Sequence, residues 1–421
     1  MHGKILIRRI GSTYANARLF STKSRLAVVG SGPAGMFTCN GLLRKSDLSI
    51  DVFEFSPVPF GLVRYGVAPD HQENRSRLKL FCNVNVGQDI TFDELTKNYD
   101  AVLLAYGSYK TRKLNIPGSE SKNVISGSEF VGWYNGVPNA LTPDLSTENV
   151  VIVGNGNVAL DCARVLSTAP SEKAITKDIK ILGRRGPESV SFTIKEIREQ
   201  FKIKEWDSKI EVSEKDQKSL LESLPKLERK KKRLTEVLLK NIGVANGSRQ
   251  CHFLFHRIPK KIVPNNTGTV KELIVMNKES GKEEIVPCGL LIYSIGYETL
   301  VLNGVPQNEK NMIDMKDHCR VNVDAACPSR VYATGWCAHG PRGVIVDTQQ
   351  NSLFVADQIA SDFANRTMRP TPGVEMLLEE RKIPFISWDA WKLIDQQEKD
   401  KGKLTGKIRE KFTTFEKFLS K

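Results

Sequence analysis

The chain has 421 residues, of which 40% are hydrophobic and 26% charged, a composition that excludes a mainly disordered, collagen-like or coiled-coil protein. Its length predicts roughly two to three domains, and its longest apolar runs, such as 290–295, fall far short of the roughly 20 residues that span a bilayer. The formal net charge of +14 is compatible with a nucleic acid, an anionic membrane surface or an acidic protein as partner, so the distribution of charge along the chain must decide between them.

The amino terminus is basic and contains no acid before Asp47. Its mixture of Arg, Ser, Thr and small apolar residues is typical of a mitochondrial transit peptide, whereas a secretory signal needs a continuous apolar block. Residues 1–20 are therefore predicted to be a transit peptide, and the mature chain to start near Ser21, after a stretch that resembles a matrix-protease cleavage site. A basic tail without a targeting role is the alternative.

The eight cysteines are spread through the chain, and no two of them form a C-x-x-C pair. Spacings typical of zinc, iron-sulfur or redox-dithiol sites are absent, so no metal site is predicted. Reduced structural thiols are the expectation, in keeping with a matrix compartment.

A first dinucleotide-binding motif follows the β-branched run 25–29 and leads into a helical pattern. In the sequence GSGPAG, Gly30 permits a tight turn, Gly32 allows close approach to a pyrophosphate, and Gly35 lets the helix pack on the strand. The next expected strand ends at Glu54, where a carboxylate can bind ribose hydroxyls. Together these features indicate a nucleotide-binding domain.

A second motif follows the run 149–153, with the sequence GNGNVA at 154–159. The strand expected at 178–182 ends just before Arg184 and Arg185. An NAD site would place an acid there, whereas paired arginines suit the 2′-phosphate of NADP. Solvated charges at a strand end are the alternative interpretation.

Two nucleotide folds in one chain, with no separate substrate domain, are typical of a flavoenzyme that takes hydride from a nicotinamide. The predicted fold is α/β, with two Rossmann-like dinucleotide-binding domains that bind FAD and NADP(H). The expected crossovers, 100–118 and 330–335, insert the NADP domain into the FAD domain. The predicted domains are therefore 21–108 with 329–421 for FAD, and 109–328 for NADP.

Several long motifs resemble the NADPH:adrenodoxin (ferredoxin) oxidoreductase family. They are PVPFGLVRYGVAPDH at 57–71, GNGNVALD at 154–161, GRRGP at 183–187 with FTIKE at 192–196, and GW at 335–336 with GPRGVI at 340–345. The resemblance runs from about residue 25 to residue 420 and is more specific than generic dinucleotide signatures.

The resemblance implies a set of cofactor-binding residues. FAD would be held by Gly30, Ser31, Gly32, Pro33, Ala34, Gly35, Glu54, Leu62, Val86, Trp336, Gly343, Val344 and Ile345. NADPH would be held by Gly154, Asn155, Gly156, Asn157 and Val158, with Arg184 and Arg185 on the 2′-phosphate and Glu196 on the adenosine side. Without the motif, Glu196 is equally an i,i+4 neighbour on a charged helix.

The resemblance also places His71 and Asp161 near the hydride-transfer site. We interpret them as positioning and electrostatic residues, because the cofactors themselves supply the chemistry. A histidine in a loop after Pro69 is otherwise more often a structural hydrogen-bonding residue. Arg342 and Asp347 depart from the family pattern, which has small neutral residues there.

Positive charge is concentrated between residues 195 and 261, with 18 Lys and Arg against 10 Asp and Glu. The densest part lies within an amphipathic pattern, 220–239, that predicts one helix with its basic groups outward. A solvated helix face explains most such runs. The family instead implies a docking surface for an acidic [2Fe-2S] ferredoxin, formed by Arg198, Arg229, Lys230, Lys231, Lys232 and Arg233.

The sequence thus predicts electron transfer from NADPH through FAD to a ferredoxin in the mitochondrial matrix, supporting iron-sulfur, haem or P450 and steroid chemistry. The alternatives are a generic NADPH-dependent flavin diaphorase and a glutamate-synthase-like flavin reductase, although the latter needs clustered cysteines. Binding of nucleic acid is not expected, because residues 229–240 contain no aromatic residue for base stacking. Peripheral association with the inner membrane and the oligomeric state stay open.

Overall fold

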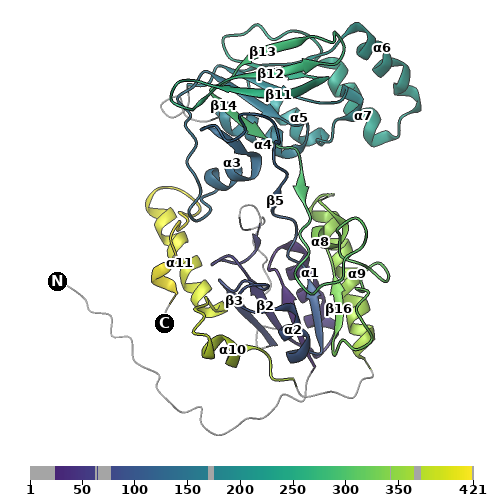
Figure 1. Ribbon diagram of the computed structural model, residues 1–421, viewed down its shortest axis with the longest axis vertical. Helices are drawn as coiled ribbons and strands as arrows, with labels where there is room; N and C mark the ends of the chain where they lie inside the picture. The colour runs from purple at the N-terminus through teal and green to yellow at the C-terminus, as the bar shows by residue number, and fades with distance from the viewer. Residues whose placement is uncertain are drawn as a thin grey trace, which may run out of the picture. The chain divides into compact units, whose positions relative to one another are not determined.

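The computed structural model describes residues 24–61, 64, 77–168, 175–341, 343–364 and 371–419. They divide into two compact units: the first lies within 1–108, 299–395 and 418–421, and the second within 109–298 and 396–417. Both units are α/β structures (Figure 1). The transit peptide expected at residues 1–20 lies outside the described residues.

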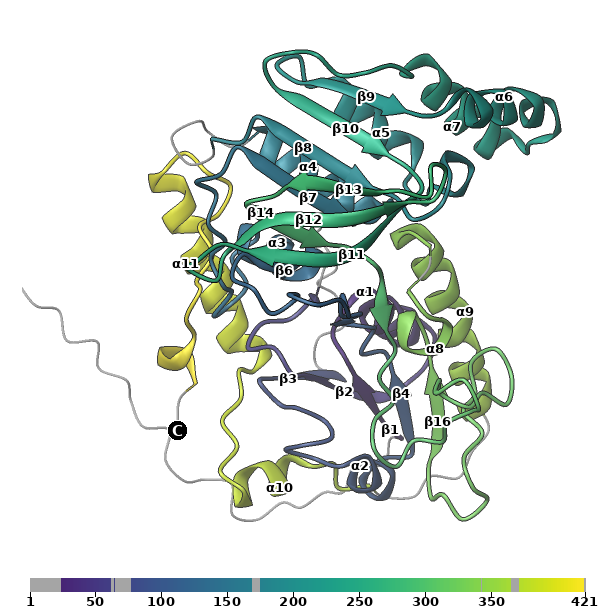
Figure 2. The ribbon, with the colours of Figure 1, turned by 45° about the horizontal axis from the view of Figure 1, so that its top comes forward.

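The first unit is built on a five-stranded parallel sheet in the order β16-β4-β1-β2-β3, with α1 and α9 packed closely together (Figures 1 and 2). Gly41 makes this contact possible, since a Cβ there would lie 2.7 Å from the Ala356 Cβ. The elements are β1 (Arg25–Val29), α1 (Pro33–Lys45), β2 (Ser49–Glu54), β3 (Leu78–Cys82), α2 (Phe92–Asn98), β4 (Ala101–Leu104), β16 (Arg330–Ala333), α8 (Trp336–His339), α9 (Ile345–Phe363) and α10 (Glu375–Glu380).

The second unit contains a six-stranded parallel sheet in the order β6-β14-β7-β8-β10-β9. An antiparallel sheet, β11-β12-β13, accompanies it (Figure 2), together with a two-stranded sheet, β15-β5. The strands are β5 (Lys110–Thr111), β6 (Val124–Ser126), β7 (Asn149–Val153), β8 (Asp178–Leu182), β9 (Asp207–Glu211), β10 (Gln250–Leu254), β11 (Arg257–Pro264), β12 (Val270–Asn277), β13 (Glu283–Pro287), β14 (Leu290–Tyr293) and β15 (Tyr297–Glu298).

The helices of the second unit are α3 (Gly127–Tyr134), α4 (Asn157–Thr168), α5 (Ile194–Phe201), α6 (Glu214–Ser223) and α7 (Arg229–Lys240). Helix α11 (Trp388–Leu404) begins in the first unit and ends in the second. Each parallel sheet has strands that are buried on both faces, which is why β1, β4, β7 and β14 are continuous apolar runs.

The boundary between the units differs from the predicted one. The chain returns to the first unit after Glu298, not after residue 328, because Val305, Ile313 and Val321 are buried in the hydrophobic core of the first unit. The short strands β5 and β15 pair where the chain enters the second unit and where it leaves. Residues 396–417, predicted to lie in the FAD domain, belong to the second unit.

The single helix expected over 220–239 is wrong. The structure has two helices, α6 and α7, separated by a short 3₁₀ turn at Leu224–Lys226. Pro225 explains the break, because proline lacks the backbone N–H that would continue the helix. Among the described residues, no helix combines the length and the hydropathy needed to cross a membrane.

Candidate functional site

The turn between β1 and α1 is the tightest part of the first nucleotide motif. Gly30 has φ +103°, and a Cβ there would lie 2.6 Å from the Ala105 carbonyl oxygen. A Cβ at Gly35 would lie 2.2 Å from the Gly30 oxygen. By contrast, none of the described residues lies within 4 Å of a Cβ built on Gly32, and the first turn of α1 has no acid. The first backbone N–H groups of α1 are therefore open to an anion such as a pyrophosphate.

Glu54 is buried at the carboxyl end of β2, beside this turn. Its carboxylate accepts hydrogen bonds from Ser31 N at 3.0 Å, Ser31 Oγ at 2.6 Å and Ser56 N at 3.0 Å. Burial raises the pKa of the Glu54 carboxyl, and the bonds from Ser31 and Ser56 oppose that shift. The group is held in one orientation where a carboxylate can accept hydrogen bonds from ribose hydroxyls.

The loop after β16 contacts the start of α1. Gly335 has φ +71°, and a Cβ there would lie 2.6 Å from the Ala34 Cβ. Thr334 is fully buried, and its Oγ1 has no hydrogen-bond partner within the described part of the chain. Pro33 occupies the first turn of α1, where its missing N–H costs nothing. An orphaned hydroxyl and a cradle of glycines beside a helix N-terminus fit a bound dinucleotide.

The start of α9 exposes three consecutive apolar side chains, Val344, Ile345 and Val346. Asp347 accepts a hydrogen bond from Val344 N at 2.9 Å, so this departure from the family pattern caps the helix. Gly343, at φ +81°, makes the turn before it. An exposed apolar run in this position fits the edge of a flavin ring.

Other residues predicted to bind FAD are less informative. Trp336 begins α8 and is half-buried. The Val86 side chain is buried in the core, which leaves only its backbone for a cofactor. Leu62, His71 and Arg342 lie outside the described residues.

The second nucleotide motif lies between β7 and α4. Gly154 has φ +133°, and a Cβ there would lie 2.1 Å from the Ser294 oxygen. The Asn155 side chain lies against Gly183, where a Cβ would be 1.8 Å from Asn155 Nδ2. Asn155 Oδ1 is buried and has no hydrogen-bond partner among the residues that the structure describes. This orphaned acceptor fits a hydroxyl or amide of a bound nucleotide.

Three further residues of this motif can reach a nucleotide mainly through their backbone. Asn157 Oδ1 accepts a hydrogen bond from Thr193 N at 2.7 Å, which joins the start of α4 to the start of α5. Val158 packs on Gly127, where a Cβ would lie 3.0 Å from Val158 Cγ1. Gly156 has only Ser191 Oγ near its missing Cβ, at 3.5 Å.

Arg184 and Arg185 are exposed directly after β8. Neither forms an ion pair with a described residue; the guanidinium Nη2 of Arg185 is 3.4 Å from the Ser189 oxygen. Arg257, which follows the adjacent strand β10, is different because its guanidinium binds Glu284 at 2.8 and 3.2 Å. Of these three described arginines, Arg184 and Arg185 are therefore the two whose guanidinium groups have no carboxylate partner among the described residues.

Two predicted site residues, Asp161 and Glu196, converge on Arg164. Its Nη2 lies 2.9 Å from Glu196 Oε2, and the same guanidinium also binds Asp161 and Glu199. Burial raises the pKa of the Asp161 carboxyl, an effect that Arg164 opposes. Sequence reasoning missed Arg164, although its i,i+3 spacing from Asp161 on a helix was a usable signal.

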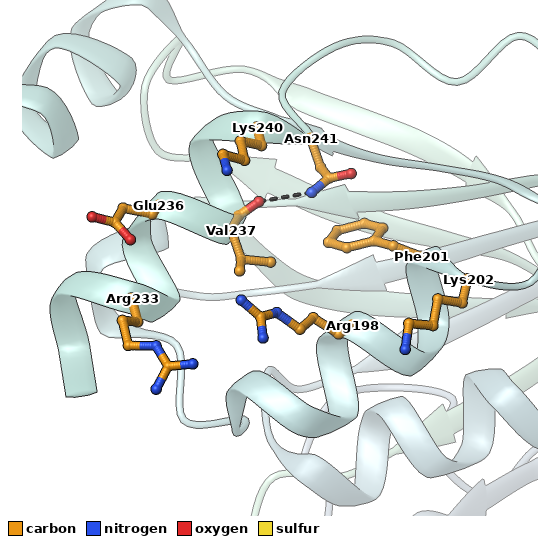
Figure 3. Close-up of a pocket in the computed structure, with 8 residues that line it drawn as sticks. All are labelled: Arg198, Phe201, Lys202, Arg233, Glu236, Val237, Lys240 and Asn241. Carbon is orange, nitrogen blue, oxygen red and sulfur yellow. Dashed lines mark hydrogen bonds between the residues drawn. The ribbon is translucent and has the colours of Figure 1, made fainter. Parts of the chain in front are cut away.

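The predicted basic surface gathers around a groove between α5 and α7 (Figure 3). The groove has a volume of about 330 Å³ and is lined by Arg198, Phe201, Lys202, Arg233, Glu236, Val237, Lys240 and Asn241. Arg198 and Arg233 come from separate helices, and both extend into the groove. Lys202 and Lys240 were not predicted. Arg229, Lys230 and Lys231 are exposed at the start of α7, and Lys232 is half-buried.

Comparison with known proteins identifies the class. Residues 24–352 match the pyridine nucleotide-disulphide oxidoreductase family. The chain also resembles the structure of Mycobacterium tuberculosis FprA in complex with NADPH, with a TM-score of 0.81 and 29% identity over 94% of this chain and 99% of that one. Thioredoxin reductase from T. acidophilum, at 14% identity and a TM-score of 0.54, shares the fold alone. The chain therefore belongs to this family of oxidoreductases, whose cofactors here are FAD and NADP(H).

Curated relatives narrow the assignment. The human mitochondrial NADPH:adrenodoxin oxidoreductase is 35% identical over 97% of this chain and 94% of its own length. The Drosophila melanogaster protein of the same name is 36% identical, over 98% and 97% respectively. The Salvelinus fontinalis protein is 36% identical, over 93% and 89%. Within its class, the chain belongs to the NADPH:adrenodoxin oxidoreductases.

Proposed function

We propose that this protein takes electrons from NADPH, through FAD, and delivers them singly to an acidic [2Fe-2S] ferredoxin in the mitochondrial matrix. The observation that carries the proposal is the presence, in one chain, of two different nucleotide sites. One contains a buried acid, Glu54, that would bind a ribose, and the other contains Arg184 and Arg185, which form no ion pair with a described residue and would bind the 2′-phosphate. The relatives named mitochondrial NADPH:adrenodoxin oxidoreductase support the direction of electron flow.

The first unit would hold FAD, with its pyrophosphate on the open N–H groups at Gly32 and its adenosine ribose on Glu54. Gly335 packs against Ala34 in the same helix start, and the hydroxyl of the adjacent Thr334 is buried without a partner among the described residues. Val344 and Ile345 would cover the flavin ring and exclude water from it. When bound, FAD converts the two electrons of one hydride into single-electron transfers.

The second unit would hold NADPH. The backbone at 155–158 would bind the pyrophosphate, and the buried Asn155 Oδ1 would accept a hydrogen bond from the nucleotide. Arg184 and Arg185 would bind the 2′-phosphate through charge-assisted hydrogen bonds. Because Arg257 is neutralised by Glu284, it would contribute little to that site.

Asp161 and Glu196 would act as a positioning pair. Arg164 keeps both carboxylates at the junction of α4 and α5 and opposes the rise in the pKa of Asp161 that burial causes. The guanidinium of Arg164 would thereby hold the Asp161 carboxyl in one position beside the nucleotide. A role for His71 near the transfer site stays a proposal from the family motif alone.

The groove between α5 and α7 would receive the acidic ferredoxin. Four basic side chains and one acid line it, and Phe201 and Val237 supply apolar contacts. The electrostatic field of such a surface raises the rate of association with an acidic partner. The increase becomes smaller at high salt, because ions screen the charges. Arg229, Lys230 and Lys231 extend the same field along α7.

The test is ferredoxin-dependent reduction of cytochrome c by residues 21–421, with NADPH or NADH, at low and high salt. The expected result is dependence on ferredoxin, a preference for NADPH and a lower rate at high salt. The double variant Arg198→Glu/Arg233→Glu should raise the KM for ferredoxin at least about tenfold. Lys218→Glu, an exposed lysine on α6, is the matched control and should leave it unchanged.

A generic flavin diaphorase is the competing function, favoured only by the shared class of fold. It would reduce cytochrome c or quinones at rates that ignore both ferredoxin and salt. That outcome would refute the proposed partner while leaving the cofactor sites intact. Absence of bound flavin would refute the proposal at its first step.

A further inference from the structure

Three side chains of the kind that bind metal ions meet in the second unit, although they come from separate parts of the chain. Asp216 lies in the first turn of α6, His256 directly precedes β11, and Glu279 lies in the turn that joins β12 to β13. One ligand atom of each residue lies within 4.8 Å of the ligand atoms of the other two. The three residues belong to neither nucleotide motif and do not line the groove between α5 and α7.

Two of these side chains already have the spacing of neighbouring metal ligands. His256 Nε2 lies 2.9 Å from Asp216 Oδ2, and the two side chains are only 22% and 14% exposed. Ligand atoms at right angles around a metal ion, each at about 2.1 Å from it, lie about 3 Å apart. Glu279 is exposed, so its side chain has room to move toward the other two and complete the set.

The charges of the two carboxylates are not balanced by a basic side chain. Within the described part of the chain, neither Asp216 nor Glu279 forms an ion pair with a lysine or an arginine, although the sequence has 62 of these residues. Two carboxylates at this separation repel each other. His256 can offset at most one of the two negative charges, and only when it is protonated. A divalent cation would neutralise both.

Hydrogen bonds around the cluster hold the three residues in place. The Ser213 hydroxyl donates to Glu279 Oε1 at 2.6 Å and accepts from the Asp216 N–H at 3.2 Å, so one side chain orients two of the acids. The His256 carbonyl oxygen accepts from the Lys278 N–H at 2.9 Å, which joins the histidine to the turn that carries Glu279. Bonds of this kind orient metal ligands before the ion binds.

His252, in β10, also has two carboxylate neighbours but offers no such site. Its Nδ1 contacts Glu211, and its Nε2 lies 3.5 Å from Asp178 Oδ1. The two acids thus lie at different nitrogens of the ring and cannot share one ion with it. At His256, by contrast, both carboxylates come within 4.8 Å of a single ring nitrogen and of each other.

We propose that Asp216, His256 and Glu279 bind one Zn²⁺ ion, with water completing its coordination. One imidazole and two carboxylates form a ligand set that suits zinc, whereas Mg²⁺ prefers oxygen ligands alone. The ion would have a structural role, because it would join the start of α6, the segment before β11 and the β12–β13 turn. The His256 N–H donates to the Arg185 oxygen at 3.4 Å, so the same ion would also steady a residue proposed to bind NADPH. Cysteine spacing could not predict this site, because no cysteine takes part.

The test is equilibrium dialysis of the flavin-loaded chain, residues 21–421, against Zn²⁺ after treatment with EDTA, with the metal content measured per chain. We expect one Zn²⁺ per chain and a higher melting temperature with Zn²⁺, because an ion that binds the folded chain stabilises it. Mg²⁺ at the same concentration should produce neither effect. His256→Gln and Glu279→Gln should each weaken the affinity for Zn²⁺ at least about tenfold. His318→Gln, which alters an exposed histidine outside the cluster, is the matched control and should bind Zn²⁺ like the unaltered chain.

Glu279→Gln is the decisive variant, because its side chain is exposed and the substitution keeps its size, so the chain should fold normally. Zn²⁺ affinity that is the same in this variant as in the unaltered chain would overturn the proposal and leave an adventitious ion only. An unaltered chain that binds no Zn²⁺, or that binds Mg²⁺ equally well, would also overturn it. Metal content and melting temperature are measured without NADPH or ferredoxin, so failure of the proposed electron transfer would show separately.

Discussion

Arg164 Nη2 lies 2.9 Å from Glu196 Oε2 and thereby ties α4 to α5 at the nucleotide motif. The same guanidinium binds Asp161 and Glu199, so one cation holds three carboxylates. A single side chain therefore controls the geometry of two residues that the family motif places at the NADPH site.

Replacing Arg164 with Met should leave these carboxylates to repel one another. We expect the KM for NADPH to rise about tenfold, since partly buried charges lose their partner. Steady-state kinetics with saturating ferredoxin measures this. Lys177→Met, which removes an exposed ion pair with Glu148 in the same unit, is the control. An unchanged KM would show that Asp161 and Glu196 do not act at the nucleotide.

Arg184→Ala and Arg185→Ala should each reduce kcat/KM for NADPH about 10- to 100-fold, because each would remove the proposed charge-assisted hydrogen bonds to the 2′-phosphate. The value for NADH, which lacks that phosphate, should stay the same. Arg257→Gln serves as the control, since its guanidinium already binds Glu284. Equal losses with both coenzymes would place the two arginines outside the phosphate site.

Gly32→Ala and Gly35→Ala should fail in different ways. A Cβ at Gly35 would lie 2.2 Å from the Gly30 oxygen, so that variant should misfold. A Cβ at Gly32 meets none of the described atoms within 4 Å, so that variant should fold with a nearly unchanged melting temperature but no longer retain FAD. Flavin absorbance and thermal melting of the purified variants separate the two outcomes. A Gly32→Ala protein that retains FAD fully would place the pyrophosphate elsewhere.

Acid stability should depend on the contact between Glu94 and Arg381. The hydrogen bond from Arg381 lowers the pKa of Glu94 from 4.5 to about 2. A depressed folded-state pKa contributes stability above the unfolded value of 4.5, and this contribution is lost as the pH falls toward 2. Urea denaturation should show that Arg381→Met is less stable than the parent chain near pH 7, with the difference shrinking below pH 4.5.

The control for this pH effect is Lys97→Met, which removes an exposed ion pair with Asp93 on the same helix as Glu94. It should change stability little at any pH, because water screens exposed pairs. A difference for Arg381→Met that stays constant down to pH 2 would show that Arg381 acts through packing or its bond to the Asp89 oxygen instead.

The glycine motifs predicted the turns at Gly30 and Gly154 correctly because the requirement is local: positive φ and no room for a Cβ. Contacts between residues that lie far apart in the chain could not be predicted in this way. The burial of Val305 and Ile313 in the first unit, which moves the boundary, depends on partners far away in sequence. The bond that Asn157 receives from Thr193 also spans many residues, and no sequence pattern reports it.

The basic surface was also predicted only in part, namely where it depends on residues that are close in sequence. The dense run at 229–233 was visible in the sequence, but its approach to Arg198 arises from packing of α5 against α7. Pro225 was also visible, and its effect on the expected helix could have been recognised from its missing N–H.

The second unit is completed only by residues 396–417, which follow the last residues of the first unit's main body in the chain. Phe412 and Phe415 are buried, and Lys411 Nζ bonds the Asn135 oxygen. During synthesis, residues 109–298 leave the ribosome long before this closing stretch does. All residues of the second unit are therefore present only when nearly the whole polypeptide has been made.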